Sequence, residues 1–273
     1  MARSAHANRW ITALVALPFL IALVYWGNIA FTLLVVAAAE VCLGEYFRMA
    51  FDPYGQTVSG LLIAVAMGIG SAVILAADGG RTDLALALIA VNTLFCGLFA
   101  VTQAGRDPVI LRNVAHQIQG MAYIPLCLAF LVLIRNGADG RIWIFLLLAV
   151  IFAGDIGAYY VGSYWGRHRL CPMVSPKKTV EGSLGGLAAN LLVGAVGKAM
   201  FLPELPWGGS LLFFVCAGAI GQAGDLFESA IKRTSGIKDS GTILPGHGGI
   251  LDRIDALLFA APLTYIFKVY ILS

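Results

Sequence analysis

Long stretches without charge constrain the fold of this chain more than any other feature. No Asp, Glu, Lys or Arg occurs between Arg9 and Glu40, and only 12% of the 273 residues are charged. About a quarter of the residues in a soluble chain are charged, whereas a helix crosses a bilayer with about 20 apolar residues. The sequence therefore predicts an all-α, polytopic integral membrane protein.

Turn-forming clusters of Gly, Pro, Asn and Asp separate the apolar runs and delimit about nine transmembrane helices. We interpret the first run as a retained span, because another apolar run follows it almost at once. The predicted spans are residues 10–26, 29–47, 57–77, 83–101, 115–134, 142–162, 183–201, 209–229 and 254–272. We expect one membrane domain, with N-terminal helices in residues 1–140 and C-terminal helices in residues 141–273. The C-terminal part carries charged loops at 163–182 and 230–253.

The basic residues predict an orientation, since cytoplasmic loops are rich in Lys and Arg. With nine spans, 13 of the 18 Lys and Arg residues fall on one side of the membrane. Eight of those 13 lie in the two charged loops, so the count mainly indicates that both loops are cytoplasmic. This places the N-terminus in the cytoplasm and the C-terminus on the far side.

Other compositional features exclude some classes of function. A net charge of +3 is too modest to indicate a nucleic-acid-binding protein. The five cysteines form no CxxC pair and have no metal-ligand spacing. We interpret them as small buried apolar side chains.

The first charged loop and the span before it contain two candidate features. Asp155 lies in an apolar span, where an ionisable side chain marks either a functional site or a polar contact between helices. Lys177 and Lys178 precede a glycine-rich helix start, where they and the free backbone amides could bind phosphate. Alternatively, the two lysines fix topology or contact anionic lipid.

The second charged region has carboxylates at helical spacing. Asp225, Glu228 and Lys232 share one helix face, and Asp252 and Asp255 share a face of the next helix. If these helices pack together, the three aspartates can converge on one point. Mg²⁺ is commonly held by one or two carboxylates together with substrate phosphates.

A glycine-rich turn and several basic residues accompany these carboxylates. Gly248 and Gly249 follow His247, and glycine permits close approach of the backbone to a ligand. The countercharge for phosphate would come from Lys232, Arg233, Lys238 and Arg253. The alternative is a solvated loop with salt bridges at the helix ends.

Residues Ser229 to Asp255 resemble the signature of the phosphatidate cytidylyltransferase (CDP-diacylglycerol synthase) family. That signature reads Ser-x-apolar-Lys-Arg, four residues, Lys-Asp-x-small, two residues, apolar-Pro-x-His-Gly-Gly-apolar-x-Asp-Arg-apolar-Asp, and this stretch matches it without departure. The segments around Asp155 and from Ser175 to Gly182 are also similar to that family. The resemblance covers about residues 150–273 and is specific, because the signature is long.

This resemblance implies an integral membrane enzyme that uses Mg²⁺ to convert CTP and phosphatidic acid to CDP-diacylglycerol and pyrophosphate. It assigns Mg²⁺ to Asp225, Asp252 and Asp255, leaves room for a second cation, and is compatible with a homodimer. The expected catalytic residues are Asp225, Lys232, Arg233, Lys238, Asp239, His247, Asp252, Arg253 and Asp255. The expected substrate-binding residues are Asp155, Ser175, Lys177, Lys178, Thr179, Glu181, Glu228, Gly248 and Gly249.

Several alternatives stay open at this point. A CTP-dependent lipid kinase or a cytidylyltransferase for another lipid phosphate would need similar residues, and an ion-coupled transporter is a more distant reading. His247 would orient a phosphate, protonate the leaving group or serve only the turn. Glu40 and Glu45 would line a lipid-accessible cavity or lie near the membrane surface. We expect a bacterial inner membrane location.

Overall fold

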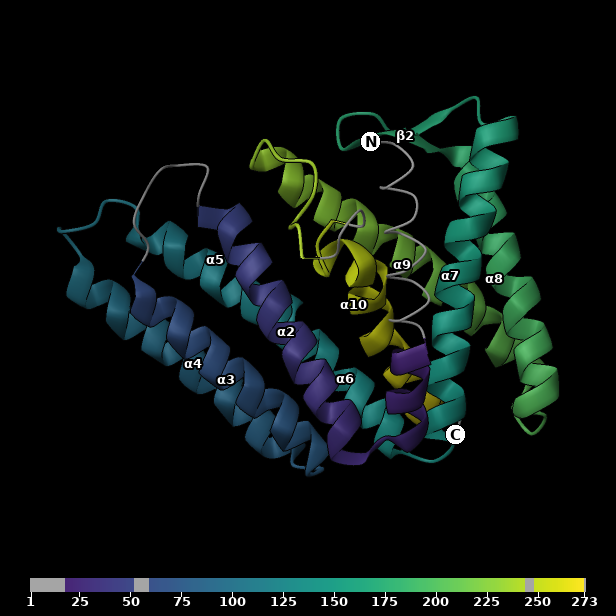
Figure 1. Ribbon diagram of the computed structural model, residues 1–273, viewed down its shortest axis with the longest axis horizontal. Coiled ribbons are helices and arrows are strands. Elements are labelled where there is room, and N and C mark those ends of the chain that lie inside the picture. The colour runs from purple at the N-terminus through teal and green to yellow at the C-terminus, as the bar shows by residue number, and fades with distance from the viewer. Residues whose placement is uncertain (1–17, 52–58, 244–247, 273) are drawn as a thin grey trace. The chain divides into compact units, whose positions relative to one another are not determined.

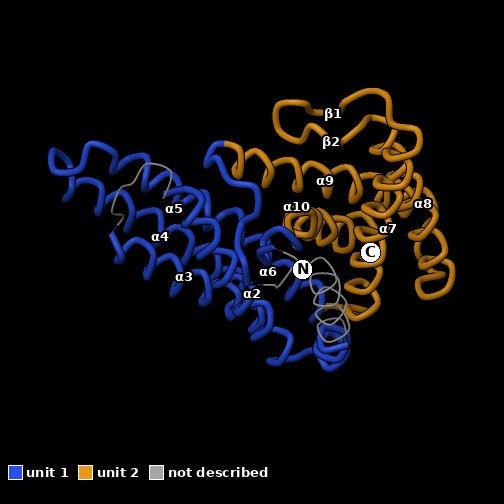
Figure 2. Tube along the Cα trace, turned by 45° about the horizontal axis from the view of Figure 1, so that its top comes forward, with its two compact units in different colours: residues 1–136, 234–253 blue, residues 137–233, 254–273 orange. Residues whose placement is uncertain are grey.

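The computed structural model describes residues 18–51, 59–243 and 248–272, and most of these residues lie in helices (Figure 1). The chain divides into two compact units, which Figure 2 colours separately. Unit 1 consists of Met1–Asn136 and Thr234–Arg253, and unit 2 consists of Gly137–Arg233 and Ile254–Ser273. The second charged loop therefore belongs to the same unit as the N-terminal helices.

Unit 1 is a helical bundle in which α2 packs against α3, α5 and α6. Its helices are α2 (Asn28–Phe51), α3 (Gly60–Asp78), α4 (Thr82–Gln103), α5 (Ile110–Tyr123) and α6 (Pro125–Asn136), preceded by helical residues 18–26. Ala39, Leu43 and Tyr46 of α2 are at most 1% exposed. Their spacing of three and four residues gives α2 one continuous face in the core.

One predicted span is divided in the structure. The sequence predicts a single helix over residues 115–134, whereas α5 ends at Tyr123 and α6 begins at Pro125. Proline has no amide hydrogen and clashes with the preceding turn, so a helix breaks before it. Residues Ile110–Asn136 together still have the length and apolar character of one membrane span.

Unit 2 contains the remaining elements. They are α7 (Gly140–Trp165), β1 (Arg169–Cys171), β2 (Ser175–Thr179), α8 (Val180–Phe201), α9 (Trp207–Thr234), α10 (Leu251–Ile266) and the π-helical turn η2 (Phe267–Ile271); α10 begins in the segment assigned to unit 1. α7 and α8 lie against each other along most of their length. A Cβ added to Gly157 would lie 2.9 Å from the carbonyl oxygen of Gly185, so small residues allow these backbones to approach closely.

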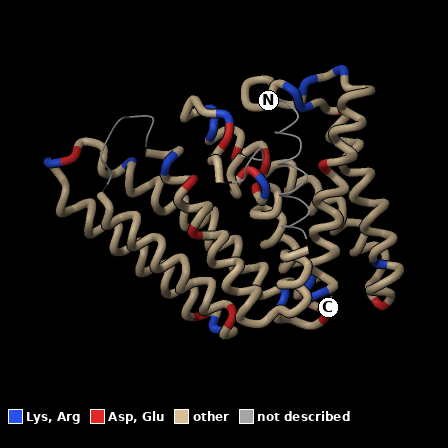
Figure 3. The backbone as a smooth tube through the Cα atoms, in the orientation of Figure 1, with Lys and Arg blue, Asp and Glu red and all other residues tan. Residues whose placement is uncertain are grey.

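The apolar helices confirm the prediction of a polytopic membrane protein. Among the described residues, eight helical segments are long and apolar enough to cross a membrane. They correspond to the second through ninth predicted spans; of the first span, 10–26, only residues 18–26 are described, and these are helical. Figure 3 shows long uncharged stretches within the helices, with most Lys, Arg, Asp and Glu near helix ends and in loops.

The segment predicted as one polar loop, residues 163–182, contains regular structure. α7 continues to Trp165, β1 and β2 pair antiparallel with Arg169 opposite Thr179, and α8 begins at Val180. The strands are too short and too polar to show an alternating apolar pattern, so the sequence did not reveal them. In the second charged region, α9 continues to Thr234, which shortens the predicted loop 230–253 to residues 235–250.

Candidate active site

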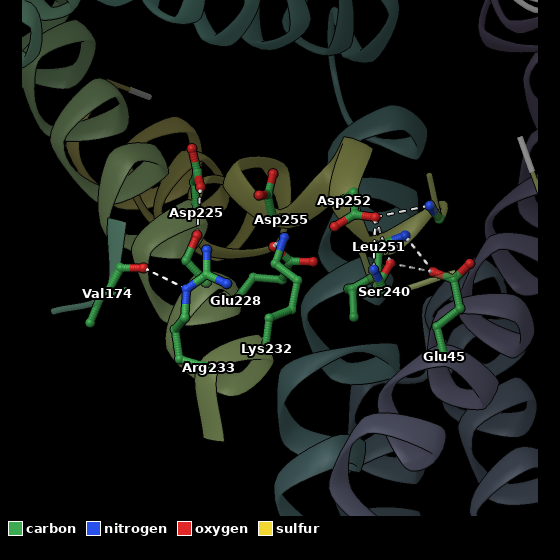
Figure 4. A network of polar contacts seen from close by, with 12 residues as sticks. Glu45, Val174, Asp225, Glu228, Lys232, Arg233, Ser240, Leu251, Asp252 and Asp255 are labelled. Atoms are coloured by element: carbon green, nitrogen blue, oxygen red, sulfur yellow. Dashed lines mark hydrogen bonds and ion pairs between the residues drawn. The ribbon is translucent and has the colours of Figure 1, made fainter. Parts of the chain in front are cut away.

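Two aspartates on neighbouring helices of unit 2 form the centre of the candidate site. α9 and α10 approach closely at Gly224, where an added Cβ would lie 2.6 Å from the carbonyl oxygen of Asp255. The rings of Phe227 and Phe259 pack beside this contact, with centroids 5.4 Å apart. Asp225 and Asp255 interact electrostatically here (Figure 4). Two carboxylates with like charge are thus brought together by the helix contact.

Three further charged residues of unit 2 interact with Asp225 or Asp255. Asp255 also interacts electrostatically with Asp155 of α7 and Lys232 of α9. Lys178 of β2 forms an ion pair with Asp225, with 2.5 Å between Nζ and Oδ2. These two side chains are 28% and 32% exposed, so solvent weakens the pair and an incoming anion can compete for the lysine.

The β1–β2 hairpin and the start of α8 are held by local hydrogen bonds. Thr179 caps α8, because its hydroxyl oxygen accepts from the Gly182 amide at 3.1 Å. Glu181 accepts from the backbone amides of Arg167 and His168 at 3.0 and 3.1 Å, and its other oxygen lies 2.6 Å from His168 Nδ1. Glu181 therefore fixes the connection from α7 to the hairpin, while its contact with substrate stays a prediction.

The end of α9 carries the next group of candidate residues. Glu228 is fully buried and forms an ion pair with Lys232, one helical turn further on. The Arg233 Nε donates a hydrogen bond to the carbonyl oxygen of Val174, at 3.1 Å, which links α9 to the hairpin. Ser175 is partly exposed and Lys177 is exposed on the same hairpin. Three lysines, one arginine and four carboxylates of unit 2 thus lie on α9 and the elements next to it: Lys177, Lys178, Lys232, Arg233, Asp155, Asp225, Glu228 and Asp255.

A small pocket lies beside Asp155 in unit 2. Its polar lining residues are Asp155 of α7, Asn190 of α8 and Gln222 of α9, and the rest of the lining is apolar, with glycines of α7 and α9, Ile151 and Ala256. Gln222 exchanges hydrogen bonds with Ser183 through its Oε1 and, at 3.1 Å, its Nε2. Sequence reasoning missed Asn190 and Gln222, although polar amides inside apolar helices are the signal that could have identified them.

Asp252 has a different environment, within unit 1. Its Oδ2 accepts hydrogen bonds from the Ser240 and Gly249 amides, both at 2.9 Å, and lies 3.0 Å from the Ser240 hydroxyl (Figure 4). Gly248, the residue before Gly249, has a φ of +80°, a conformation that glycine adopts readily. This oxygen of Asp252 therefore closes the glycine-rich turn.

Glu45 of α2 makes contacts that the sequence did not predict. Its carboxylate is 1% exposed and accepts from the amides of Ile250 and Leu251, at 3.1 and 2.8 Å. The donors lie more than 200 positions later in the chain. No local spacing could have predicted such a contact.

The remaining candidates lie on the loop of unit 1 and around it. Lys238, Asp239 and Arg253 are exposed. His247 lies outside the described residues, so its predicted role is not addressed by the structure. Lys238 of the loop and Arg253 of α10 therefore carry positive charge at a surface, whereas Asp252 is partly buried.

The sequence predicts a Mg²⁺ site, and the carboxylates of unit 2 can be compared with the ligands that this ion needs. Among residues 18–51, 59–243 and 248–272, no group of three His, Cys, Asp or Glu side chains is arranged to hold a metal ion. The pair formed by Asp225 and Asp255 fits Mg²⁺, because this ion commonly takes one or two protein carboxylates and completes its shell with water and phosphate. Asp252 as a third ligand stays a prediction.

Comparisons with known proteins point in one direction. The sequence profile described as the cytidylyltransferase family matches residues 7–271. A protein of Bacillus subtilis named phosphatidate cytidylyltransferase is 35% identical over 261 residues, which cover 94% of this chain and 96% of that protein. A protein of the same name from Staphylococcus saprophyticus is 33% identical over 96% of this chain and 99% of its own length. A third, from Synechocystis, is 50% identical over 140 residues, 50% of this chain and 47% of that protein.

Proposed function

The chain belongs to the cytidylyltransferase family, and from this premise we propose that it transfers the cytidylyl group of CTP to phosphatidic acid. The products are CDP-diacylglycerol and pyrophosphate. Family membership over residues 7–271, the shared name of the relatives and the signature from Ser229 to Asp255 support this activity.

The chemistry makes modest demands on the protein. A phosphate oxygen of phosphatidic acid attacks the α-phosphorus of CTP and forms a new P–O bond. The bond from the α-phosphorus to the oxygen that bridges the α- and β-phosphates breaks, and pyrophosphate keeps the bonding electrons. A phosphomonoester has its second pKa near 6, so the nucleophile is already largely ionised at neutral pH. The protein therefore acts by positioning the substrates and neutralising charge, without a strong general base.

The pairing of Asp225 and Asp255 beside Lys178 is the observation that carries this proposal. Two carboxylates close together repel each other unless a cation reduces their charge. Mg²⁺, held by Asp225 and Asp255, would supply this charge and would neutralise phosphate oxygens when bound. Asp252 as a further ligand, and a second cation, belong to the same proposal.

Basic side chains of the hairpin and of α9 would bind the phosphates. Lys178 is partly exposed beside Asp225, and Arg233 links the end of α9 to the hairpin. Lys177 is exposed on the same hairpin and provides a further positive charge. Together they would neutralise the triphosphate, while Lys232 stays paired with the buried Glu228.

We further propose that the protein lies in a bacterial plasma membrane with its charged loops in the cytoplasm. The excess of Lys and Arg in these loops supports this orientation, and the supply of CTP in the cytosol requires it. With nine spans, the N-terminus would be cytoplasmic and the C-terminus would lie on the far side. Cysteine accessibility of the two ends in intact cells would test this.

Two radioactive labels test the activity against its nearest rivals. Purified protein in detergent would receive phosphatidic acid, Mg²⁺ and CTP labelled either in the α- or in the γ-phosphate. We expect only the α-label to enter the lipid, whereas a CTP-dependent kinase would transfer the γ-label. In a parallel reaction, an isoprenoid phosphate replaces phosphatidic acid as the acceptor. If that lipid were labelled and phosphatidic acid were not, the proposed acceptor would be wrong.

A further inference from the structure

Glu45 is a carboxylate enclosed by backbone amides at the start of another helix. It lies on α2, six residues before that helix ends at Phe51, and is 1% exposed. Oε1 accepts from the Ile250 amide at 3.1 Å, and Oε2 accepts from the Leu251 amide at 2.8 Å. A buried carboxylate is costly unless it is hydrogen-bonded, and here both oxygens have donors.

These amides belong to the N-terminus of α10, which begins at Leu251. The first amides of a helix have no partner inside the helix, and the helix dipole favours a negative charge at this end. Free phosphate groups are often bound at such positions. In this chain the position is taken by Glu45, so the protein uses its own carboxylate where an anionic ligand could otherwise bind.

The same helix, α2, also contacts the loop of residues 235–250 at two positions, Ser235 and Ser240. The Ser235 hydroxyl donates to the carbonyl oxygen of Met49 at 2.6 Å, close to the end of α9. The Ser240 hydroxyl lies 3.1 Å from Glu45 Oε2 and 3.0 Å from Asp252 Oδ2. A hydroxyl has a single hydrogen, so it serves one of these carboxylates at a time. The loop is thus tied to α2 at two points.

We propose that Glu45 is a positioning residue for the reaction, because it fixes the start of the helix that carries Asp252 and Asp255. Asp252 lies in the first turn of α10, and Asp255 follows one turn later. A helix whose first turn is held by hydrogen bonds frays less there, so Asp252 and Asp255 keep their places in the first two turns of α10. The N-terminal half of the chain thereby contributes to a reaction whose signature lies in the C-terminal half. This inference rests on the proposed function.

Glu45→Gln tests the contact with little change in size, since it removes the charge and replaces one acceptor oxygen with a donor. Glu40→Gln is the matched control, because Glu40 lies on the same helix and accepts from the Ser71 hydroxyl at 2.6 Å. Hydrogen exchange of the peptide that contains Ile250 and Leu251 would be followed by mass spectrometry. We expect at least about tenfold faster exchange in Glu45→Gln and wild-type exchange in Glu40→Gln.

The second readout is the reaction itself. We expect Glu45→Gln to raise the Mg²⁺ concentration for half-maximal rate about tenfold and to lower kcat, with little change in the KM for phosphatidic acid. Glu40→Gln should titrate like the wild type. Ser240→Ala provides a milder version of the same change and is used if Glu45→Gln fails to fold, with smaller shifts of the same sign.

The outcomes separate the two proposals. A wild-type protein that transfers no cytidylyl group contradicts the proposed function, whatever the variants do. If the wild type is active and Glu45→Gln matches Glu40→Gln in exchange and in Mg²⁺ dependence, the positioning role is wrong. Faster exchange with an unchanged Mg²⁺ dependence and kcat would reduce Glu45 to a structural contact and would also overturn the inference.

Discussion

The carboxylates of the two units differ in what surrounds them. In unit 2, Asp225 forms an ion pair with Lys178, interacts electrostatically with a second carboxylate, Asp255, and is about one third exposed. In unit 1, Glu45 and Asp252 accept hydrogen bonds from backbone amides, and Glu45 is almost fully buried. The same type of side chain therefore has charged side chains as partners in one unit and backbone amides as partners in the other.

This difference indicates a division of tasks. A carboxylate paired with a flexible lysine can exchange that partner for a metal ion or follow the lysine to a phosphate. A carboxylate that accepts from amides holds the chain in one conformation, and removing it leaves buried donors unpaired. The acidic residues of unit 2 are thus suited to substrate chemistry, and those of unit 1 to holding the loop and the start of α10.

The largest expected effect comes from Asp255→Asn, which breaks the pair in unit 2. We expect the rate of cytidylyl transfer to fall about 10³-fold, because one of two carboxylates for Mg²⁺ loses its charge. Membrane insertion and thermal stability should stay at wild-type values. The exposed Asp83→Asn on α4 is the control and should keep full activity. An Asp255→Asn variant with half of the wild-type turnover would remove Asp255 from the metal site.

Two substitutions of Asp252 sharpen the comparison, since this residue has both a structural contact and a predicted metal role. In Asp252→Asn the remaining oxygen can accept the hydrogen bonds now made by Oδ2, so stability should be kept while activity falls about 10²-fold. Asp252→Ala leaves the Ser240 and Gly249 amides unpaired and should also lower the free energy of unfolding by about 1–3 kcal/mol. Thermal unfolding and turnover would be measured on both. An active Asp252→Asn variant would confine this residue to the structural task.

Lys178→Ala tests the partner of Asp225. We expect about a tenfold rise in the KM for CTP with a smaller fall in kcat, since a charged hydrogen bond to phosphate is lost. Lys177→Ala, on the neighbouring exposed position, should raise the same KM less. Initial rates over a range of CTP and lipid concentrations separate the two substrates. An effect limited to phosphatidic acid would reverse the assignment of Lys178 to CTP.

The smallest expected effect concerns the cap of α8. Thr179→Ala removes the acceptor for the Gly182 amide and should lower stability by about 1 kcal/mol. Thr179→Ser keeps the hydroxyl and should behave like the wild type. Circular dichroism melts of the three proteins would show this difference. Equal melting temperatures for Thr179→Ala and Thr179→Ser would mean that the cap contributes nothing to stability.

Much of the helical framework could be predicted from the sequence, because apolar runs longer than a bilayer is thick leave few alternatives. The spacing of Asp225, Glu228 and Lys232 also predicted their common place on α9, since it follows from the helical repeat. The electrostatic interaction between Asp225 and Asp255 requires only that α9 and α10 pack together, as they do at Gly224. These features depend on local geometry, which the sequence carries directly.

Other features depend on contacts between distant segments and could not be predicted. The amides of Ile250 and Leu251 belong to the backbone, so no residue type marks them as partners of Glu45. The β1–β2 hairpin is too short for its pattern to be read, and beside it the Val180 amide donates to the His168 carbonyl oxygen at 2.8 Å. Sequence patterns report side chains, whereas these contacts are made by the backbone.

Release of pyrophosphate from CTP by the purified protein is the most direct test of the central claim. The reaction would be run in detergent with and without phosphatidic acid, and with and without Mg²⁺. The account predicts release only when the lipid and Mg²⁺ are both present. Folded protein that releases no pyrophosphate under these conditions, or that releases it without any lipid phosphate, would contradict the account.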